Sequence, residues 1–429
     1  MNTSIMLFTR DLRLHDNPAL AAACAGGDVV PLFVVDRGIL AGPMAVPNRL
    51  RFLADALADL QASLRGRGAD LIVRAGDPAE EAGRLAHETG ATSLHLADDR
   101  SRYALRRLAA LRDLPLDVTV HPGATVVPSG DLRPTGGDHY KVFTPYWRAW
   151  AAAPRRGVLR TPRTISLPGG LYPGEMPDLE RPGVSPGLAK GGETEARRLM
   201  KAWLSHGVDS YDDTRDVLAD DKGTSRLSAH LRFGCLSPLE LAVAASAYEP
   251  YTRQLAWRDF HHQVAAAFPD LARRDYRPRG KGWRSDDDAL KAWEEGRTGV
   301  PIVDAGMRQL RHEGFMHNRA RMITASYLTR DLGLDWRHGY RCFRYWLADG
   351  DLANNPGNWQ WVAGTGNDTR PNRTMNPLRQ ADRHDPDGAY VHRWLPELAG
   401  LPGKAAHRPW GTLDEPADYP PPLTLPNGA

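Results

Sequence analysis

The sequence predicts an α/β N-terminal domain with a Rossmann-like parallel sheet, followed by an all-α C-terminal domain. In the first 125 residues, short β-type runs alternate with helical stretches, which is the pattern of a parallel sheet with right-handed crossovers. Beyond Glu193 the apolar residues keep a helical period nearly to Arg408. A stretch rich in Pro, Gly, Arg and Thr separates the two regions. We therefore expect domains at 1–127 and 193–429, joined by a surface linker at 128–192.

The N-terminal domain is predicted to alternate strands with helices. Its β-type runs cover residues 4–9, 28–36, 70–76, 92–97 and 117–123. The clearest helix between them has leucines at alternating spacings of three and four, at Leu50, Leu53, Leu57, Leu60 and Leu64. Such a spacing gives one apolar stripe, as in a helix packed on a sheet. No G-x-G-x-x-G motif follows the first run, so a dinucleotide fingerprint is absent there.

The remainder of the chain is predicted to be irregular and then helical. Within the linker, residues 144–152 ("TPYWRAWAA") indicate a short helix. A helix that starts at Glu193 ends at Gly207, a residue typical of a C-cap. Ser237, followed by Pro and by Glu three residues later, is typical of an N-cap. Further helices are expected at 251–268, 286–296, 301–313, 317–331 and 337–348.

The composition is that of an ordinary globular protein, with 41% hydrophobic and 25% charged residues. No apolar run reaches membrane-spanning length and no signal-peptide pattern opens the chain, so we expect a cytoplasmic protein without a membrane partner. The scattered Cys24, Cys235 and Cys342 predict neither a disulfide framework nor a metal site. Residues 251–348 carry 18 Lys and Arg against 12 Asp and Glu. Such an excess suits a polyanion, although a solvated surface explains it more often.

Hydroxyl and cationic side chains gather in "DDKGTSRLSAHLRFGCLSP", residues 220–238. Thr224, Ser225, Arg226 and Ser228 stand just before a predicted helix. Hydroxyls, a guanidinium and free backbone N–H groups at that position can hold a pyrophosphate. An ordinary Ser/Thr helix cap is the alternative, and the segment taken alone favours it.

One helical face of "RQLAWRDFHHQ" (253–263) carries an amide, an indole and two basic groups, at Gln254, Trp257, Arg258 and His261. An indole beside an amide and a cation can stack a base and bond its edge. A partly buried aromatic helix explains the pattern equally well.

A second wall of polar groups is expected from "MHNRARM" and "DGDLANNPGNWQW". Asn318, Arg321 and Met322 fall within one helical turn, and Asp349 and Asp351 follow further along the chain. Either carboxylate can pair with Arg321, and the neighbouring asparagines can bond a heteroaromatic ring. Paired carboxylates also occur in glycoside hydrolases, but there one acid needs a raised pKa in a cleft. The surrounding Arg and Asn favour a hydrogen-bonding role.

Together and in this order, these segments resemble the photolyase and cryptochrome flavoproteins, in particular bacterial class I cyclobutane pyrimidine dimer photolyases. The resemblance rests on "TRDLRLHDNPAL", "GTSRLS", "QLAWRDF", "MHNRARM", "DGDLANNPGNWQW" and "NPLRQADRHDPDGAYVHRWLPEL". It spans nearly the whole chain with the motif order intact.

The resemblance implies that the helical domain binds FAD in a U shape, beside a hole that admits a flipped lesion. It places on the phosphate side of FAD the residues Tyr211, Thr224, Ser225, Arg226, Leu227 and Ser228. It places around the flavin ring Arg321, Asp349, Asp351 and Asn355, the last near N5. Further cofactor contacts are implied for Gln254, Trp257, Arg258 and Asn318.

The resemblance also implies a light-driven activity on UV-damaged DNA. Excited, fully reduced FAD would donate an electron to a cyclobutane pyrimidine dimer, the ring would split, and the electron would return. The implied lesion contacts are Gln254, Trp257, Asn318, Met322 and Trp361, with the two indoles as a stacking wall. The implied DNA contacts are Trp257, Arg258, His261, Arg319 and Trp361. Trp359, Trp336 and Trp283 match the proximal, middle and surface members of the family's electron-transfer chain.

Gln254 departs from cyclobutane-dimer photolyases, which commonly have Glu at this position. An amide still donates a hydrogen bond but cannot release a proton. Gln also occurs in animal cryptochromes and (6-4) photolyases, but the latter use two histidines where this chain has Asn318 and Met322. The alternative function is a cryptochrome-type blue-light photoreceptor without repair activity. Asn355 and a chain that ends at residue 429 favour repair, and a dark flavin enzyme would leave the three tryptophans unexplained.

The N-terminal domain of this family often holds an antenna chromophore, either 8-hydroxy-deazaflavin or methenyltetrahydrofolate. By resemblance, Arg10, Asp36 and Asp99 are the expected contacts, although the motif is loose. We expect the protein to act as a monomer.

Overall fold

The computed structural model describes residues 2–278, 280, 282–367, 369–370, 373–411 and 418–425. The chain forms two compact units. The first comprises Met1–Val184, Lys190–Val208 and Ser225–Pro269. The second comprises Ser185–Ala189, Asp209–Thr224 and Asp270–Ala429.

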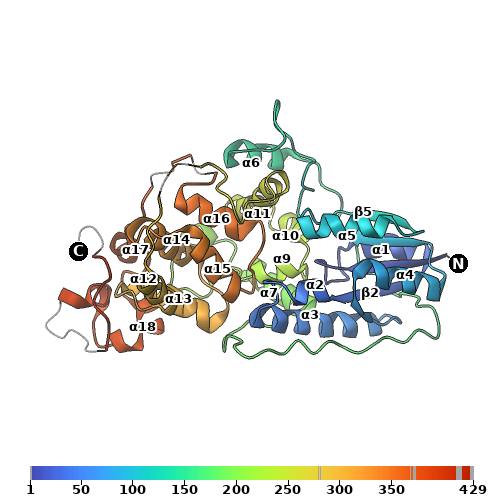
Figure 1. Ribbon diagram of the computed structural model, residues 1–429, viewed down its shortest axis with the longest axis horizontal. Coiled ribbons are helices and arrows are strands. Elements are labelled where there is room, and N and C mark those ends of the chain that lie inside the picture. Colours follow the sequence, from blue (N-terminus) through green and yellow to red (C-terminus); the bar gives the residue numbers. More distant parts are fainter. Residues whose placement is uncertain are drawn as a thin grey trace. The chain divides into compact units, whose positions relative to one another are not determined.

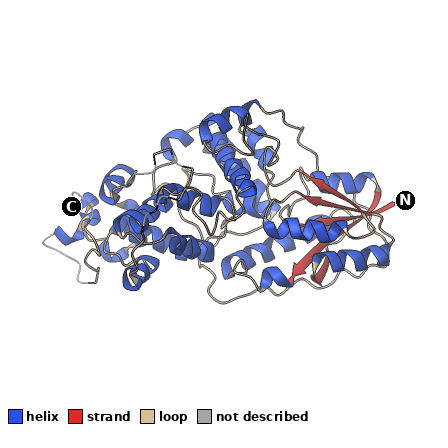
Figure 2. Ribbon diagram, turned by 45° about the horizontal axis from the view of Figure 1, so that its top comes forward, coloured by secondary structure: helices blue, strands red, loops and turns tan. Residues whose placement is uncertain are grey.

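The first unit contains a parallel sheet in the order β3-β2-β1-β4-β5, drawn as red arrows in Figure 2. Its strands are β1 (Asn2–Phe8), β2 (Gly27–Asp36), β3 (Ile72–Gly76), β4 (Ser93–Ala97) and β5 (Asp117–His121). Every ladder is parallel; Ile5, for example, pairs with Val30 on one side and Leu94 on the other. The predicted parallel α/β fold is thus confirmed, with all strands within a few residues of their expected bounds.

Helices between the strands cover the sheet (Figure 1): α1 (Pro18–Ala25), α2 (Arg37–Leu40), α3 (Pro47–Arg65), α4 (Pro78–Thr89) and α5 (Arg102–Arg112). The predicted leucine stripe lies on α3, where Leu50, Leu57, Leu60 and Leu64 are buried. The sheet itself contributes fully buried Ile5, Leu32, Ile72 and Leu94 to the core. Burial of such side chains stabilises the fold by about 1.5–3 kcal/mol each.

The first unit also holds helices from later in the chain: α6 (Phe143–Ala152), α7 (Glu193–His206), α9 (Ser228–Phe233), α10 (Pro238–Ala244) and α11 (Glu249–Ala267). The short helix predicted in the linker is α6. The predicted cap of α10 is confirmed, since the side chain of Ser237 accepts a hydrogen bond of 3.2 Å from the Glu240 backbone.

The segment after β1 binds these later helices through buried polar groups. Arg13 is 1% exposed, and its guanidinium donates to the backbone carbonyls of Gly234 and Asp16, both at 3.0 Å. The backbone N–H of Leu14 donates to Glu193 at 2.7 Å. The "TRDLRLHDN" motif is therefore, in large part, a structural connection within the first unit.

Residues 153–184 contain no helix or strand among the described residues, yet they are bonded to the α/β layer. The carbonyl of Ser166 accepts from Val29 at 2.7 Å, and that of Pro173 accepts from Val73 at 2.6 Å. This part of the predicted linker thus lies against strands β2 and β3.

The second unit is helical. It contains α8 (Tyr211–Thr214), α12 (Asp287–Glu295), α13 (Pro301–Glu313), α14 (Asn318–Ser326), α15 (Trp336–Trp346), α16 (Asn354–Ala363), α17 (Pro377–His384) and α18 (Ala389–Trp394). A π-helical turn, η1 (Tyr327–Asp331), continues α14, so the helix predicted at 317–331 changes type part-way. Short 3-10 turns at 396–398, 403–407 and 409–411 follow.

The core of the second unit is rich in tryptophan, with Trp293, Trp336 and Trp359 at most 2% exposed. Asp304 accepts from Thr298 and Gly299 and from the hydroxyl of Tyr419 at 2.5 Å, which anchors the described C-terminal segment. No helix in the described part of either unit is long and apolar enough to cross a membrane.

Candidate functional site

An arginine–carboxylate pair lies at the centre of the predicted polar wall in the second unit. The guanidinium of Arg321, on α14, donates to both carboxylate oxygens of Asp349 at 3.1 and 2.8 Å. Its Nε also donates to the carbonyl of Met316 at 2.8 Å. The Asp349 side chain is 7% exposed, so this bidentate pair is largely shielded from water. The predicted partnership of Arg321 with Asp349 is confirmed.

The Asp351 carboxylate binds the backbone just before and at the start of α16. Its Oδ1 accepts from the backbone N–H groups of Ala353 and Asn354, both at 2.7 Å. Of the two carboxylates, Asp349 is therefore the bidentate partner of Arg321, and the expected contact of Asp351 with a flavin ring stays a prediction. The bonds of Asp351 hold the first turn of α16, which carries the buried amide of Asn355. That amide donates one long bond, 3.5 Å, to the carbonyl of Tyr340.

On α14, Asn318 is exposed and its amide lies 3.7 Å from the sulfur of Met322, one helical turn later. Arg319 forms a two-bond pair with Asp216, at 3.1 and 2.6 Å. Burial alone would raise the pKa of Asp216, but the hydrogen bonds and charge of Arg319 hold it below its usual value. Asp216 occupies Nε and Nη2 of Arg319, so a phosphate would share this guanidinium with Asp216 or displace it.

The hydroxyl segment 224–228 makes no side-chain cap. Helix α9 begins after Leu227 without a side-chain cap hydrogen bond, so the cap interpretation of these residues was wrong. The hydroxyl of Ser225 instead accepts a 3.0 Å hydrogen bond from Tyr251. Arg226 adopts a positive φ of 51°, a left-handed conformation that L-residues rarely take without a local constraint. In the second unit, burial raises the pKa of Tyr211 to about 12.

On α11, Trp257 stacks on Phe143 of α6 with a centroid distance of 3.7 Å and an interplanar angle of 7°. His261 is 2% exposed, and its ring lies 5.8 Å from the Trp257 ring. Arg258 donates to the carbonyls of Ala124 at 2.5 Å and Leu231 at 3.3 Å. The structure thus holds His261 and Arg258 by internal contacts.

Gln254 differs from its neighbours on α11. It is exposed, and its amide reaches the Pro250 carbonyl at 3.5 Å, the limit of a hydrogen bond. The amide is therefore available to a ligand.

Phe143 and Asp259 support this part of α11, although no sequence pattern indicated either of them. Asp259 is 1% exposed, and its Oδ2 accepts from the backbone of Val126 and Val127 and from the indole of Trp150. Burial raises the pKa of Asp259 to about 6 against these hydrogen bonds and the nearby charge of Arg258. Asp259 thus fixes residues 126–127 and α6 on α11. No local sequence signal relates Phe143 to Trp257, because their contact spans more than 100 residues.

Comparison with known proteins agrees with this geometry. Residues 4–164 match a family described as DNA photolyase, and residues 251–424 match one described as the FAD binding domain of DNA photolyase. A deoxyribodipyrimidine photo-lyase of Streptomyces griseus is 52% identical, over 99% of this chain and 96% of its own. A cryptochrome DASH of Natronomonas pharaonis is 36% identical, over 96% and 93% of the two chains. A crystal structure of a bacterial class III photolyase from Agrobacterium tumefaciens superposes with a TM-score of 0.92 at 32% identity, covering 99% of this chain and 95% of that one.

The chain belongs to the DNA photolyase and cryptochrome family. Its second unit offers polar atoms that fit FAD, the cofactor of this family's C-terminal domain. The Nε1 of Trp359 is buried and has no hydrogen-bond partner among the described residues. Together with the Asn355 amide, it gives a buried site with hydrogen-bonding capacity to spare. The residues present therefore fit the cofactor.

The three tryptophans matched to the family's electron-transfer chain all lie in the second unit. The Trp359 ring packs edge-on against Phe343 and Trp293, with distances between ring centroids of 4.9 and 6.0 Å. Its ring lies directly on Gly339, one turn of α15 after Trp336. Trp283 is partly buried on the same core, next to Arg284, whose backbone N–H donates to Gly333 at 2.9 Å. Trp293 is a further buried indole in this core that the resemblance did not indicate.

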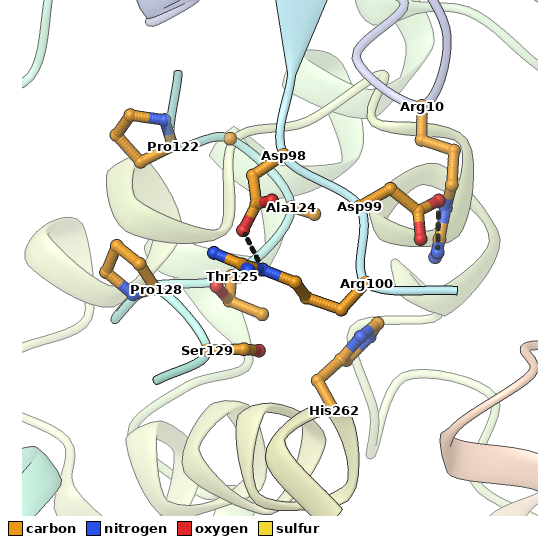
Figure 3. Close-up of a pocket in the computed structure, with 11 residues that line it drawn as sticks. Arg10, Asp98, Asp99, Arg100, Pro122, Ala124, Thr125, Pro128, Ser129 and His262 are labelled. Atoms are coloured by element: carbon orange, nitrogen blue, oxygen red, sulfur yellow. Dashed lines mark hydrogen bonds and ion pairs between the residues drawn. The ribbon is translucent and has the colours of Figure 1, made fainter. Parts of the chain in front are cut away.

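A polar pocket, partly open to solvent, lies in the first unit (Figure 3). Arg10, Asp98 to Arg100, and residues 122–125 line it, at the carboxyl ends of β1, β4 and β5. The strand order changes direction at β1, and ligands of α/β sheets bind at such switch points.

Charges alternate around this pocket. Arg10 pairs with Asp99 at 3.3 Å and Arg100 with Asp98 at 2.9 Å, and His262 extends from α11 toward them in Figure 3. Burial raises the pKa of Asp98 despite Arg100. Of the expected antenna contacts, Arg10 and Asp99 line the pocket. Asp36 is not among its lining residues; it caps α2 and accepts from the hydroxyl of Tyr103.

Proposed function

We propose that the protein is a light-dependent photolyase that splits cyclobutane pyrimidine dimers in UV-damaged DNA. The observation that carries the proposal is the 52% identity, over nearly the full length, to a relative named deoxyribodipyrimidine photo-lyase. The aromatic and amide groups implied by the resemblance are present as well. Among them, the Trp257 ring stacks parallel to Phe143, and Gln254 is exposed on the same helix as Trp257.

Reduced FAD supplies the light-excited electron donor for this reaction, and the protein positions cofactor and lesion. We propose that Tyr211, Thr224, Ser225, Arg226, Leu227 and Ser228 bind the phosphate side of FAD. Around the flavin ring we propose Arg321, Asp349, Asp351 and Asn355, where the Arg321–Asp349 pair offers a fixed donor and acceptor and Asn355 an amide. We also keep, as proposals, cofactor contacts from Gln254, Trp257, Arg258 and Asn318.

The lesion is proposed to contact Gln254, Trp257, Asn318, Met322 and Trp361. Stacking of a flipped base on an indole contributes about 1–3 kcal/mol per base. Trp257 suits this role because the Phe143 stack covers one of its faces and fixes its plane. Asn318 is exposed and lies beside the Met322 sulfur, so an amide and a thioether are offered together.

We further propose that the polar pocket of the first unit holds an antenna chromophore, a deazaflavin or a folate, with Arg10 and Asp99 as contacts. Residues 1–127 would form the antenna domain, 128–192 the linker and 193–429 the catalytic domain. A monomer in the cytoplasm is expected.

The test uses purified protein with its flavin fully reduced, mixed with an oligonucleotide that contains one thymine cyclobutane dimer. Intact thymines are measured by chromatography with and without blue light. Light-dependent recovery supports the photolyase. No recovery from a photoreducible flavoprotein supports the second candidate, a cryptochrome-type photoreceptor, which Gln254 and the 36% identity to a cryptochrome DASH favour.

A further inference from the structure

The indole of Trp336 forms a hydrogen bond with a carboxylate. Trp336 is 0% exposed, and its Nε1–H donates to Oδ1 of Asp275 at 2.9 Å. Asp275 stands in the loop after α11, 61 positions away in the chain. In the second unit, Trp359 has no comparable partner for its own N–H among the described residues. The two inner tryptophans of the proposed chain thus have different electrostatic surroundings.

Three charged side chains bonded to Trp336 or to one another lie beside its indole: Asp275, Asp335 and Arg337. Arg337 binds both oxygens of Asp335 at 3.0 Å and Oδ1 of Asp275 at 2.8 Å. Its guanidinium lies 4.8 Å from the centre of the Trp336 ring. Two carboxylates and one guanidinium leave one net negative charge beside the indole. Without Asp275 the cation would face the ring balanced by Asp335 alone.

We propose that Asp275 is a positioning residue for electron transfer: its carboxylate holds the indole of Trp336 and stabilises the positive charge that this ring carries while electrons pass along the chain. The inference rests on the proposed function, in which these tryptophans reduce a photoexcited, oxidised flavin. One electron leaves Trp336 for the oxidised ring of Trp359, and no bond is made or broken. The indole of Trp336 keeps its N–H proton. An electron from Trp283 then restores Trp336, and an external thiol supplies an electron to the oxidised Trp283.

The physical reason is the cost of a charge in a buried site. A cation formed on a fully buried ring has lost its hydration, and a fixed counter-charge within hydrogen-bond distance offsets that cost. A hydrogen bond to an ionised acceptor is also roughly twice as strong as one to a neutral acceptor. Asp275 provides both effects without rearrangement, because Arg337 fixes its carboxylate.

The experiment compares holoprotein carrying oxidised flavin with its Asp275→Asn variant. Asn keeps the shape and an acceptor oxygen but removes the charge. Transient absorption after a laser flash measures the yield of long-lived indole radical cation. We expect a loss of at least about tenfold, equal to about 1.4 kcal/mol. Asp275→Glu should restore part of the yield.

The matched control is Asp382→Asn, because Asp382 also binds an arginine with both oxygens, Arg408 at 3.0 and 2.8 Å. This variant should keep the wild-type yield. A yield within twofold of wild type for Asp275→Asn, or an equal loss for Asp382→Asn, overturns the proposal. A neutral indole radical in place of the cation also overturns it, since the proton would then have moved.

A second measurement separates this proposal from the proposed function. Chemically reduced protein does not need the tryptophan chain, so Asp275→Asn should repair dimer DNA at the wild-type rate once its flavin is reduced. If the reduced wild type repairs nothing, the proposed function fails while the flash measurement still tests Asp275. Resonance Raman bands that report hydrogen bonding of the indole N–H should shift in Asp275→Asn and not in Asp382→Asn. General misfolding would not produce this selective shift.

Discussion

Gly339 is the position at which one added methyl group should disturb the tryptophan core most. A Cβ at Gly339 of α15 would lie 2.0, 2.5 and 2.6 Å from three carbon atoms of the Trp359 ring. Ordinary contacts of this kind are 3.4–4 Å, so the indole must move by more than 1 Å. Phe343 and Trp293 pack edge-on against the same ring at 4.9 and 6.0 Å. Trp359 therefore has little room to retreat.

Two effects of Gly339→Ala on the free energy of unfolding oppose each other, and their magnitudes decide whether the variant is more or less stable than wild type. Alanine in place of glycine inside a helix stabilises by about 1 kcal/mol. Overpacking a full core costs typically about 1–3 kcal/mol and sometimes more. Here the added Cβ would lie far closer to the Trp359 ring than an ordinary van der Waals contact allows, and that ring is rigid and only 2% exposed. We expect a net destabilisation of about 2 kcal/mol.

The assay is urea unfolding followed by circular dichroism, together with flavin photoreduction under blue light. Gly157→Ala is the control, because a Cβ there meets nothing within 4 Å. The control should change stability by less than about 0.5 kcal/mol. A Gly339→Ala protein that is more stable than wild type, or that photoreduces normally, would refute the reasoning, since Trp359 would then be free to move.

Three further outcomes are expected. Phe143→Ala should weaken binding of dimer-containing oligonucleotide by about tenfold and of undamaged DNA much less, because it removes the 3.7 Å stack behind Trp257; anisotropy titrations with both oligonucleotides check this, and equal losses would contradict it. Gln254→Glu should raise the rate of repair by reduced protein a few-fold, because a protonated carboxyl can donate a hydrogen bond to the dimer and also release its proton, which an amide cannot, and leave photoreduction unchanged. Burial raises the pKa of Asp331 from 3.8 to about 6, so folding stability is lost as pH rises through this window. Asp331→Asn should therefore stabilise by about 1–2 kcal/mol at pH 8, allowing for partial exposure, and by little at pH 4, as urea midpoints would show.

The elements of the fold were predictable because their signals are local. Alternating β-type runs and the leucine stripe from Leu50 to Leu64 depend on residues a few positions apart. The cap of α10 at Ser237 is equally local, and the structure agrees with it. Residues 327–331 show the limit of such local signals, since a single π-helical turn of five residues inside a helix is too short to set an apolar period of its own.

Within the candidate site, the roles of individual carboxylates were harder to predict. Asp349 and Asp351 stand two positions apart in the same motif, yet one binds Arg321 and the other binds the backbone at the start of α16. The second contact had a local signal, an Asp shortly before a helical run. Phe143 and Asp275 had no such signal, because their contacts with Trp257 and Trp336 arise from tertiary packing.

The basic residues between 251 and 348 show why a count of charges identifies a partner poorly. Arg319 is bound by Asp216, Arg337 by Asp275 and Asp335, and Arg258 by two backbone carbonyls. Each of these cations fixes a helix or an indole within its own unit. Their positive charge still contributes to the long-range field that attracts a polyanion, but a phosphate would compete with these internal partners for the guanidinium N–H groups. In this region the excess of basic residues reflects the internal support of the site at least as much as a surface for DNA.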